Sequence, residues 1–418
     1  PVAPSTGATV ELKAVPGGPY LGSLGCPPPL TPSLTAWLWL NVQGGSAEVR
    51  EGAAEGLGEL VVCASEEALR PHVVQITGPL IRIIGDRFPS SVKSAILGTL
   101  GGLIAKAGTG LKPFVPQLQT TFLKCLADPA DAVRQRAARN LGELVRLSPR
   151  ADQLAGELAT SARSAEPEVR DAYLLALRGL LLSSGERLSP AVMEALGQQL
   201  RDMARLAVDN DEFRYSLASC LGAHTRHASM DQVRTTLSWG PLAPPAAAAA
   251  QSASDKQLHA CVLSTVAPHC GGRLAAEPAL TAAVMDAVTR YARDPDPALR
   301  VAAGRAASRM AVAVPSLLTP ACQVLGALLG PDQSTEVARQ ALLSTMAPLH
   351  IAPHAGPVKV TCELSLQKVL QLEAGLDVAQ RYLATGPGTT VRTTLTDAFL
   401  RRAAKLSGDD ELFSNEEY

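Results

Sequence analysis

One short motif recurs along the chain: an aliphatic residue, a basic residue, then small residues and a leucine. Clear copies begin at Val49-Arg50 and Val133-Arg134. Less exact copies begin at Val92-Lys93, Val169-Arg170, Phe213-Arg214, Leu258-His259, Leu299-Arg300, Val337-Ala338 and Val391-Arg392. The copies start 36 to 54 residues apart. Because self-similarity near 40 residues is typical of HEAT and armadillo repeats, the sequence predicts an all-α fold, an α-solenoid of helical hairpins.

Each copy of the motif should form the inner helix of a hairpin. In the clearest copy the apolar residues fall on one helical face: Val133, Ala137, Leu141, Leu144 and Val145. The preceding stretch 113–126 has a similar apolar spacing and early prolines, which suit the first turn of an outer helix. Turn residues such as Asp128 and Asp131 should end one helix and cap the next. A single hairpin cannot bury its own face, so stability should come from stacking.

The repeat pattern divides the chain into five predicted segments. Residues 1–45 are rich in Pro and Gly and are expected to be mostly irregular. Residues 46–237 carry HEAT repeats, and residues 257–406 carry more divergent repeats. Between them, residues 238–256 form a low-complexity segment, which we expect to be the seam between two halves of the solenoid. Residues 407–418 form an acidic tail that is too polar for a core.

Composition argues against several classes of partner. The 38 Lys and Arg residues nearly balance the 39 Asp and Glu residues, so no global field attracts a polyanion. We therefore expect no direct specific nucleic-acid site. No stretch approaches the ~18 consecutive apolar residues of a membrane span, so no membrane contact is expected. The eight cysteines show no paired spacing, which is typical of free thiols in a reducing compartment.

Catalytic motifs are missing from the sequence. It contains no phosphate-binding loop, nucleophile elbow, His-Glu-x-x-His or Cys-x-x-Cys. Cys220, His224 and His227 could share a helical face and bind a metal, but Cys220 lies on an apolar stripe and no fourth ligand is near. A packed histidine is the preferred interpretation there and at His350 and His354. The sequence therefore predicts no enzyme, no metal and no cofactor.

The recurring basic residue of the motif has a structural explanation. An acidic residue precedes it in most copies, as Glu48 precedes Arg50 and as Asp128 and Asp131 precede Arg134. A guanidinium binds carboxylates and turn carbonyls in a fixed geometry, so an Asp–Arg ladder along the inside of the solenoid is predicted. Further arginines do not fit this ladder and are freer to contact a partner or solvent: Arg136, Arg139, Arg146, Arg305 and Arg309.

Several longer stretches are more specific than the general repeat pattern. They are VQGGSAEVRE (42–51), LGEL (57–60), ALRP (68–71), ITGPLIRI (76–83), GDRF (85–88) and LKPFVPQLQTTF (111–122). Over about residues 42–222 the chain resembles the general control non-derepressible translational activator family. From about Ser238 onward only the repeat rhythm continues.

The resemblance implies a function in translational control. It implies a cytoplasmic, ribosome-associated scaffold that activates the kinase of the alpha subunit of initiation factor two during amino-acid starvation. In that family, a segment downstream of a region similar to elongation factor three binds the RWD domain of the kinase. The chain resembles the downstream part, and we expect Arg170, Arg178 and Arg214 to lie in or near the kinase-binding surface. Ribosome contact is expected mainly through other parts of such a protein.

Two other classes of function remain open from the sequence. An importin-like nuclear-transport receptor, or another HEAT-repeat scaffold, would have the same hairpin pattern. Transport receptors are usually markedly acidic, and the net charge of −1 argues against that class. An enzyme would have to depend on the weak cluster of Cys220, His224 and His227.

Overall fold

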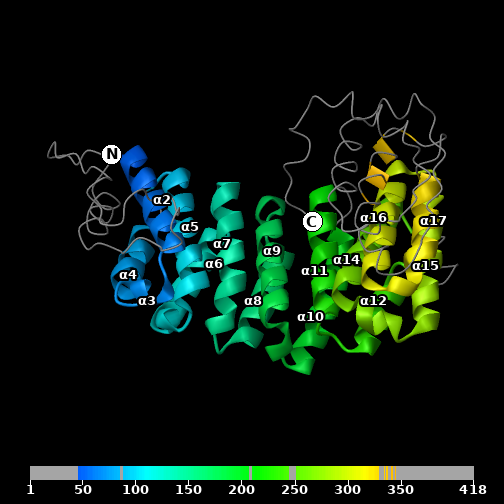
Figure 1. Cartoon of the computed structure of the whole chain (residues 1–418), viewed down its shortest axis with the longest axis horizontal. Helices are drawn as coiled ribbons and strands as arrows, with labels where there is room; N and C mark the ends of the chain where they lie inside the picture. Colours follow the sequence, from blue (N-terminus) through cyan, green and yellow to red (C-terminus); the bar gives the residue numbers. More distant parts are fainter. Residues whose placement is uncertain are drawn as a thin grey trace, which may run out of the picture. The chain divides into compact units, whose positions relative to one another are not determined.

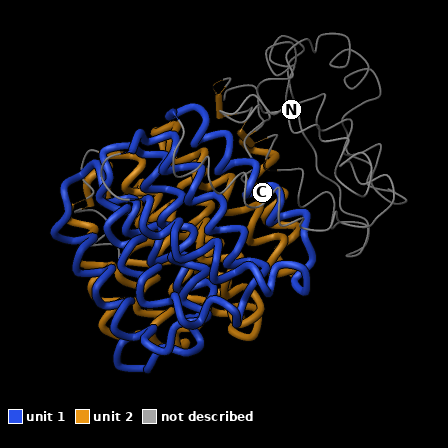
Figure 2. The backbone as a smooth tube through the Cα atoms, turned by 90° about the vertical axis from the view of Figure 1, so that its left-hand side faces the viewer, with its two compact units in different colours: residues 1–192 blue, residues 193–418 orange. Residues whose placement is uncertain are grey.

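The computed structural model describes residues 46–84, 88–206, 210–243 and 251–328, with six single positions between 334 and 344. In these residues all regular secondary structure is helical, so the predicted all-α repeat fold is confirmed. The chain divides into two compact units, residues 1–192 and 193–418 (Figure 2). None of the described helices is long and apolar enough to cross a membrane.

Several predictions fall outside the described residues. They concern the irregular segment 1–45, the acidic tail 407–418, the motif copy at Val391-Arg392, the repeats beyond residue 344, and His350 and His354. Of the predicted seam 238–256, residues 244–250 also lie outside. The helices on both sides of that seam belong to the second unit, whereas the two units meet at residues 192 and 193.

In unit 1, inner and outer helices alternate along the chain (Figure 1). The inner helices, each packed on the next, are α2 (Ala47–Cys63), α5 (Ser90–Ala107), α7 (Asp131–Leu144) and α9 (Pro167–Ser184). The outer helices are α3 (Glu66–Leu69), α4 (Val73–Ile83), α6 (Val115–Cys125) and α8 (Ala151–Ser164). Short 3₁₀ turns follow three of the inner helices: η2 (Gly108–Phe114), η3 (Val145–Leu147) and η4 (Gly185–Arg187).

Unit 2 repeats the same arrangement. Its inner helices are α11 (Asp211–Thr225), α14 (Ala253–Ala275) and α16 (Pro297–Ala313), stacked in that order. Its outer helices are α10 (Pro190–Met203), α12 (Met230–Trp239), α15 (Pro278–Ala292) and α17 (Leu318–Leu328). The 3₁₀ turns η5 (Ala204–Leu206) and η6 (Pro315–Leu317) complete the described part. Prolines at the first position of α15 and α16 lose no helical hydrogen bond there.

The core follows the predicted apolar stripes. The five stripe residues of α7 are each at most 1% exposed: Val133, Ala137, Leu141, Leu144 and Val145. Outer helix α6 supplies Leu118 and Phe122, both fully buried, to the same unit. Since aromatic residues make up only 4% of the chain, aliphatic and alanine side chains fill most of this core.

Small residues set how closely the inner helices approach. Gly142 of α7 lies against Gly179 of α9, so that a Cβ added to Gly142 would lie 2.8 Å from the Cα of Gly179. In unit 2, a Cβ added to Gly222 of α11 would lie 2.5 Å from the carbonyl oxygen of Thr265 in α14. Both distances are shorter than non-bonded carbon contacts allow. The small residues of the motif are therefore the crossing points of neighbouring repeats.

Candidate partner-binding site

Two of the three arginines predicted to bind a partner lie on α9 in unit 1. Arg170 is half-buried, and its Nη2 donates a hydrogen bond to the carbonyl oxygen of Ala165 at 2.9 Å. Arg178 lies about two turns further along and is also half-buried. Its Nε is buried and has no hydrogen-bond partner among the described residues. Both residues are partly exposed to solvent.

The third predicted arginine, Arg214 in unit 2, is only 8% exposed. Its Nη1 donates to the Ser254 hydroxyl at 2.9 Å, and its Nη2 forms an ion pair with Asp211. The side chain therefore links the start of α11 to the start of α14. Arg214 is engaged in packing between two repeats, and a partner would meet little of it.

In the ladder predicted from the sequence, Arg134 contacts both turn carbonyls and a carboxylate. Arg134 donates to the carbonyl oxygens of Asp128 and Pro129 at 3.0 and 2.8 Å, and more weakly to the Asp131 carboxylate at 3.2 Å. Between repeats, the Nζ of Lys93 contacts the Asp128 carboxylate at 2.7 Å. Asp128 was expected to cap α7, but its carboxylate binds this lysine and the turn amide of Ala130.

Unit 2 repeats both kinds of contact. Arg300 donates to the carbonyl oxygens of Asp294 and Pro295, both at 2.8 Å. Gln257 of the preceding inner helix donates to the Asp296 carboxylate at 2.8 Å. Asp296 also caps α16, since its side chain accepts a hydrogen bond from the amide of Ala298, as a turn aspartate is expected to do. The ladder is thus a structural feature of the array.

A second set of contacts between repeats was not predicted. Basic side chains at the end of one inner helix donate to carbonyl groups at the end of the preceding one. Lys106 bonds Val62 and Ala64, and Arg187 bonds Val145 and Arg146. Arg273 bonds Thr225, Arg226 and Ala228 in the same way. These cations satisfy carbonyls that a helix end leaves unpaired, and they complement the negative end of its dipole.

The arginines outside the ladder divide into engaged and free groups. Arg136 donates to the carbonyl oxygen of Ser94 at 2.7 Å, and Arg309 donates to that of Ser264 at 3.2 Å. Arg305 contacts Gln340 at 3.3 Å, and Arg146 forms an exposed ion pair with Glu143 at 3.1 Å. Arg139 is exposed and makes no hydrogen bond or ion pair with any residue that the structure describes.

The candidate metal cluster is a packed region of unit 2. His224 is fully buried, and its Nε2 lies 2.8 Å from the carbonyl oxygen of Met193. Burial, aided by the nearby Arg201 charge, lowers the pKa of His224. Cys220 is fully buried as well. Within the described ranges, no three His, Cys, Asp or Glu side chains form a group that could hold a metal ion.

Another buried histidine occupies the basic position of a motif copy. His259 is 5% exposed and meets the Trp239 ring edge-on, with ring centroids 5.0 Å apart. Burial lowers the pKa of His259 to about 4, against a smaller opposing effect of Asp255. A neutral imidazole thus replaces the usual arginine, and its neighbour is an aromatic ring.

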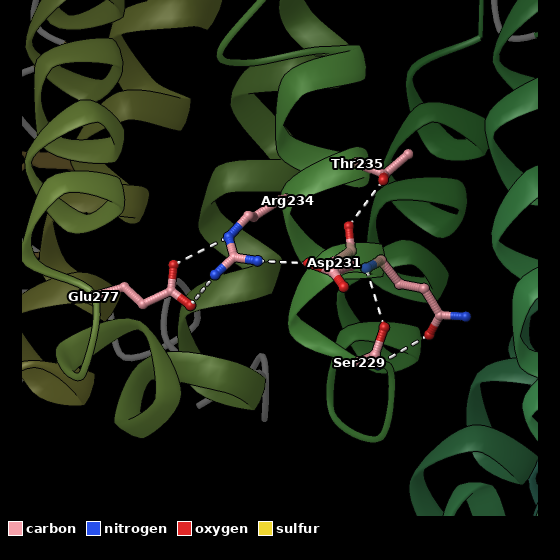
Figure 3. Close-up of polar contacts among 6 residues, drawn as sticks. Ser229, Asp231, Arg234, Thr235 and Glu277 are labelled. Carbon is pink, nitrogen blue, oxygen red and sulfur yellow. Dashed lines mark hydrogen bonds and ion pairs between the residues drawn. The ribbon is translucent and has the colours of Figure 1, made fainter.

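An ion-pair network joins the outer helices of unit 2 (Figure 3). Arg234 of α12 contacts Glu277, which precedes α15, at 2.6 Å and Asp231 at 2.6 Å. Gln232 closes a capping box with Ser229 and donates to Glu194 of α10 at 2.7 Å. The Arg234 side chain is 47% exposed, so solvent weakens these ion pairs and they contribute little to stability.

The chain is similar to known proteins over part of its length. Residues 152–242 match the family model "Stalled ribosome sensor GCN1-like, HEAT repeats", and residues 118–148 match the HEAT repeat. Protein ILITYHIA of Arabidopsis thaliana is 45% identical over 56% of this chain and 9% of that protein. Stalled ribosome sensor GCN1 of Mus musculus is 41% identical over 57% of this chain and 9% of that protein. The eIF-2-alpha kinase activator GCN1 of Saccharomyces cerevisiae is 36% identical over 46% of this chain and 7% of that protein.

Among solved structures, the chain is similar to Kap121p bound to Pho4p, with a TM-score of 0.43 and 16% sequence identity. The similarity covers 90% of this chain and 37% of the Kap121p chain. A designed armadillo repeat protein has a TM-score of 0.37 and 12% identity over 66% of this chain and 99% of that one. The sequence matches are the stronger evidence, and each spans less than a tenth of the relative. The family model covers α8 to α12 and the relatives match a little over half of the chain, so this part of the chain is similar to a part of the HEAT-repeat array of GCN1-like proteins.

Proposed function

We propose that the chain is a non-enzymatic scaffold of the translational stress response. It would act in the cytoplasm as part of a ribosome-associated protein and promote activation of the initiation factor two alpha kinase. The observation that carries this proposal is the sequence match to GCN1 proteins, which are named stalled ribosome sensor and eIF-2-alpha kinase activator.

The stacked architecture is consistent with this role. A solenoid presents a long surface made of many similar helices, and it needs no catalytic group to act. The chain would bind the kinase through its RWD domain, while other parts of a longer protein contact the ribosome. Two weak sites on one scaffold raise the effective concentration of one partner near the other.

Within this chain, we place the kinase-docking surface at Arg170 and Arg178 of α9 in unit 1. For Arg214, in unit 2, we propose a supporting role within its own repeats. Arg178 is the best candidate for direct contact because it is half-buried and its Nε lacks a hydrogen-bond partner among the described residues. Arg214 would act by holding α11 to α14 through Ser254. Its reversal to glutamate would bury an uncompensated charge, so it makes a poor test of binding.

The test is saturable binding of the 418-residue chain to the isolated RWD domain. Arg178→Glu should weaken binding at least tenfold and leave helicity unchanged. Arg163→Glu is the matched control, because Arg163 is exposed on α8 and the charge change is the same. Equal loss in both variants would indicate general charge attraction. Absence of binding by the folded wild-type chain would place kinase docking elsewhere.

A further inference from the structure

One side of α2 is apolar and is left open by the residues that the structure describes. It is a stripe of uncharged residues three or four positions apart: Val49, Gly52, Gly56, Leu60 and Cys63. Val49 is 37% exposed, and Gly52 and Cys63 are exposed as well. A Cβ added to Gly52 would meet no atom within 4 Å. Helix α5 packs on another side of α2, at Gly58 (Figure 1).

In later repeats the corresponding side of the inner helix packs on the preceding inner helix. Seven residues after the aliphatic start of its motif copy, Thr99 of α5 donates to the carbonyl oxygen of Ala54 in α2 at 2.7 Å. Asn140 of α7 and Thr265 of α14 occupy the same motif position and donate to the preceding inner helix in the same way. In α2 this position is Gly56. The apolar stripe therefore lies where a preceding helix would pack.

The stripe of α2 differs from these packed sides in its chemistry. Within each unit, every inner helix that follows another donates a side-chain hydrogen bond to it, from Thr99, Asn140, Ser183, Thr265 or Arg309. The stripe of α2 offers glycines, aliphatic side chains and a thiol, none of which is a strong donor. It is thus better suited to an apolar segment than to another inner helix of the array.

The sequence just before α2 contains such a segment. Residues 34–40 (LTAWLWL) are apolar at six of seven positions and include two of the three tryptophans of the chain, Trp37 and Trp39. No charged residue occurs in the whole run 14–47. Covering the stripe with this segment would bury no charge, and each indole would remove a large apolar area from water.

The linker between the segment and α2 is long enough for this contact. Its five residues, 41–45, span at most about 17 Å when extended. Gly52 and Gly56 lie about 8 and 14 Å along α2 from its first residue, so Trp39 can reach either one. Gly44 and Gly45 give the linker the backbone freedom to reverse direction. A linker this short gives an effective concentration on the order of millimolar, which a second copy of the chain would have to exceed.

We propose that residues 34–40 fold back on the apolar stripe of α2, with the indoles of Trp37 and Trp39 over Gly52 and Gly56. The segment takes the place of a preceding helix and shields the stripe from water, as a repeat without a stacked neighbour requires. This contact involves none of the arginines of α9, so it is independent of the kinase-docking surface proposed above.

Amide hydrogen exchange of the 418-residue chain tests the proposal, with peptides from each helix followed by mass spectrometry. Trp37→Ala/Trp39→Ala should uncover the stripe and speed exchange in α2 about tenfold, while α7 and α9 keep their protection. Tyr20→Ala/Leu24→Ala is the matched control, because both residues lie in the same uncharged run but outside the segment. The control should leave exchange in α2 unchanged.

Tryptophan fluorescence measures the same contact from the side of the segment. In a Trp239→Phe background only Trp37 and Trp39 emit, and their emission should lie at shorter wavelength than in the denatured chain. Gly52→Arg puts a long charged side chain on the stripe without crowding α2, so the emission should move toward that of the denatured chain. Gly156→Arg on α8, where an added Cβ also meets nothing within 4 Å, is the control and should not shift the emission.

Three results would overturn the proposal. The first is unchanged exchange of α2 in Trp37→Ala/Trp39→Ala, and the second is emission of the folded background protein at the wavelength of the denatured chain. The third is protection of α2 that falls on dilution while light scattering shows a dimer dissociating, since a second copy would then cover the stripe. None of the variants changes Arg170 or Arg178, so failure here would leave the kinase-docking proposal standing.

Discussion

At the scale of single residues, His259 makes unit 2 sensitive to acid. Its pKa in the folded chain is about 4, because the ring is buried against Trp239, while an exposed histidine has a pKa near 6.5. Between these values the unfolded chain binds more protons than the folded one. The free energy of unfolding should therefore fall as the pH drops from about 6.5 to about 4, by up to ~3 kcal/mol.

Denaturant unfolding followed at a series of pH values checks this prediction. His259→Phe keeps a ring beside Trp239 and removes the titrating group, so the loss of stability below pH 6.5 should become smaller. Part of the slope should remain, since burial also lowers the pKa of His224. His72→Phe, in a turn of unit 1, is the control. An unchanged pH dependence in His259→Phe would show that this histidine does not titrate differently on unfolding.

At the scale of helices, the glycine crossing of α7 and α9 should tolerate no added methyl group. A Cβ at Gly142 would lie 2.8 Å from the Cα of Gly179, and neither backbone can move without shifting its helix. Gly142→Ala should destabilise the chain by about 1–3 kcal/mol, the usual cost of overpacking. Gly156→Ala on α8 meets nothing within 4 Å, so there the higher helix propensity of alanine should stabilise by up to ~1 kcal/mol.

The denaturant midpoints of the two variants test this prediction. The midpoint should fall in Gly142→Ala and rise in Gly156→Ala, although the substitution is the same. Destabilisation of similar size at both glycines would mean that the crossing of α7 and α9 is not the cause.

The basic residues that donate to the end of the preceding inner helix should also stabilise the folded chain. Arg187 donates to the carbonyl oxygens of Val145, Arg146 and Ser148, so Arg187→Met removes three hydrogen bonds just after the end of α7. Hydrogen bonds to a charged group are worth about 1.5–3 kcal/mol, and a loss at the lower end of this range is expected because the site is partly exposed. Arg205→Met, at an exposed position, is the control. Calorimetry that gives equal midpoints for both variants would contradict the capping role.

At the scale of the whole molecule, the period of the motif was enough to predict the fold class and the buried stripes of α7. It did not predict the contacts between repeats, because these depend on which side chains meet across about 40 residues. From the sequence, Asp128 could either cap the helix that follows it, α7, or bind Lys93 of α5. Which of these contacts forms depends on how α5 stacks on α7. Lys106, Arg187 and Arg273 lie outside the regular motif positions, so no period singled them out. Arg214 was expected in or near a partner-binding surface, but it is only 8% exposed and donates a hydrogen bond to Ser254, 40 residues further along the chain.

A repeat array also predicts how damage spreads. In such arrays each hairpin is stabilised mainly by its direct neighbours, so a local defect should stay local. Gly142→Ala should speed amide hydrogen exchange in α7 and α9, while α14 and α16 keep their protection. Gly222→Ala should do the reverse, because its Cβ would strike the Thr265 carbonyl between α11 and α14. Exchange measured by mass spectrometry on peptides from each helix separates the two patterns. Uniform loss of protection in both variants would mean that the described helices unfold as one cooperative unit.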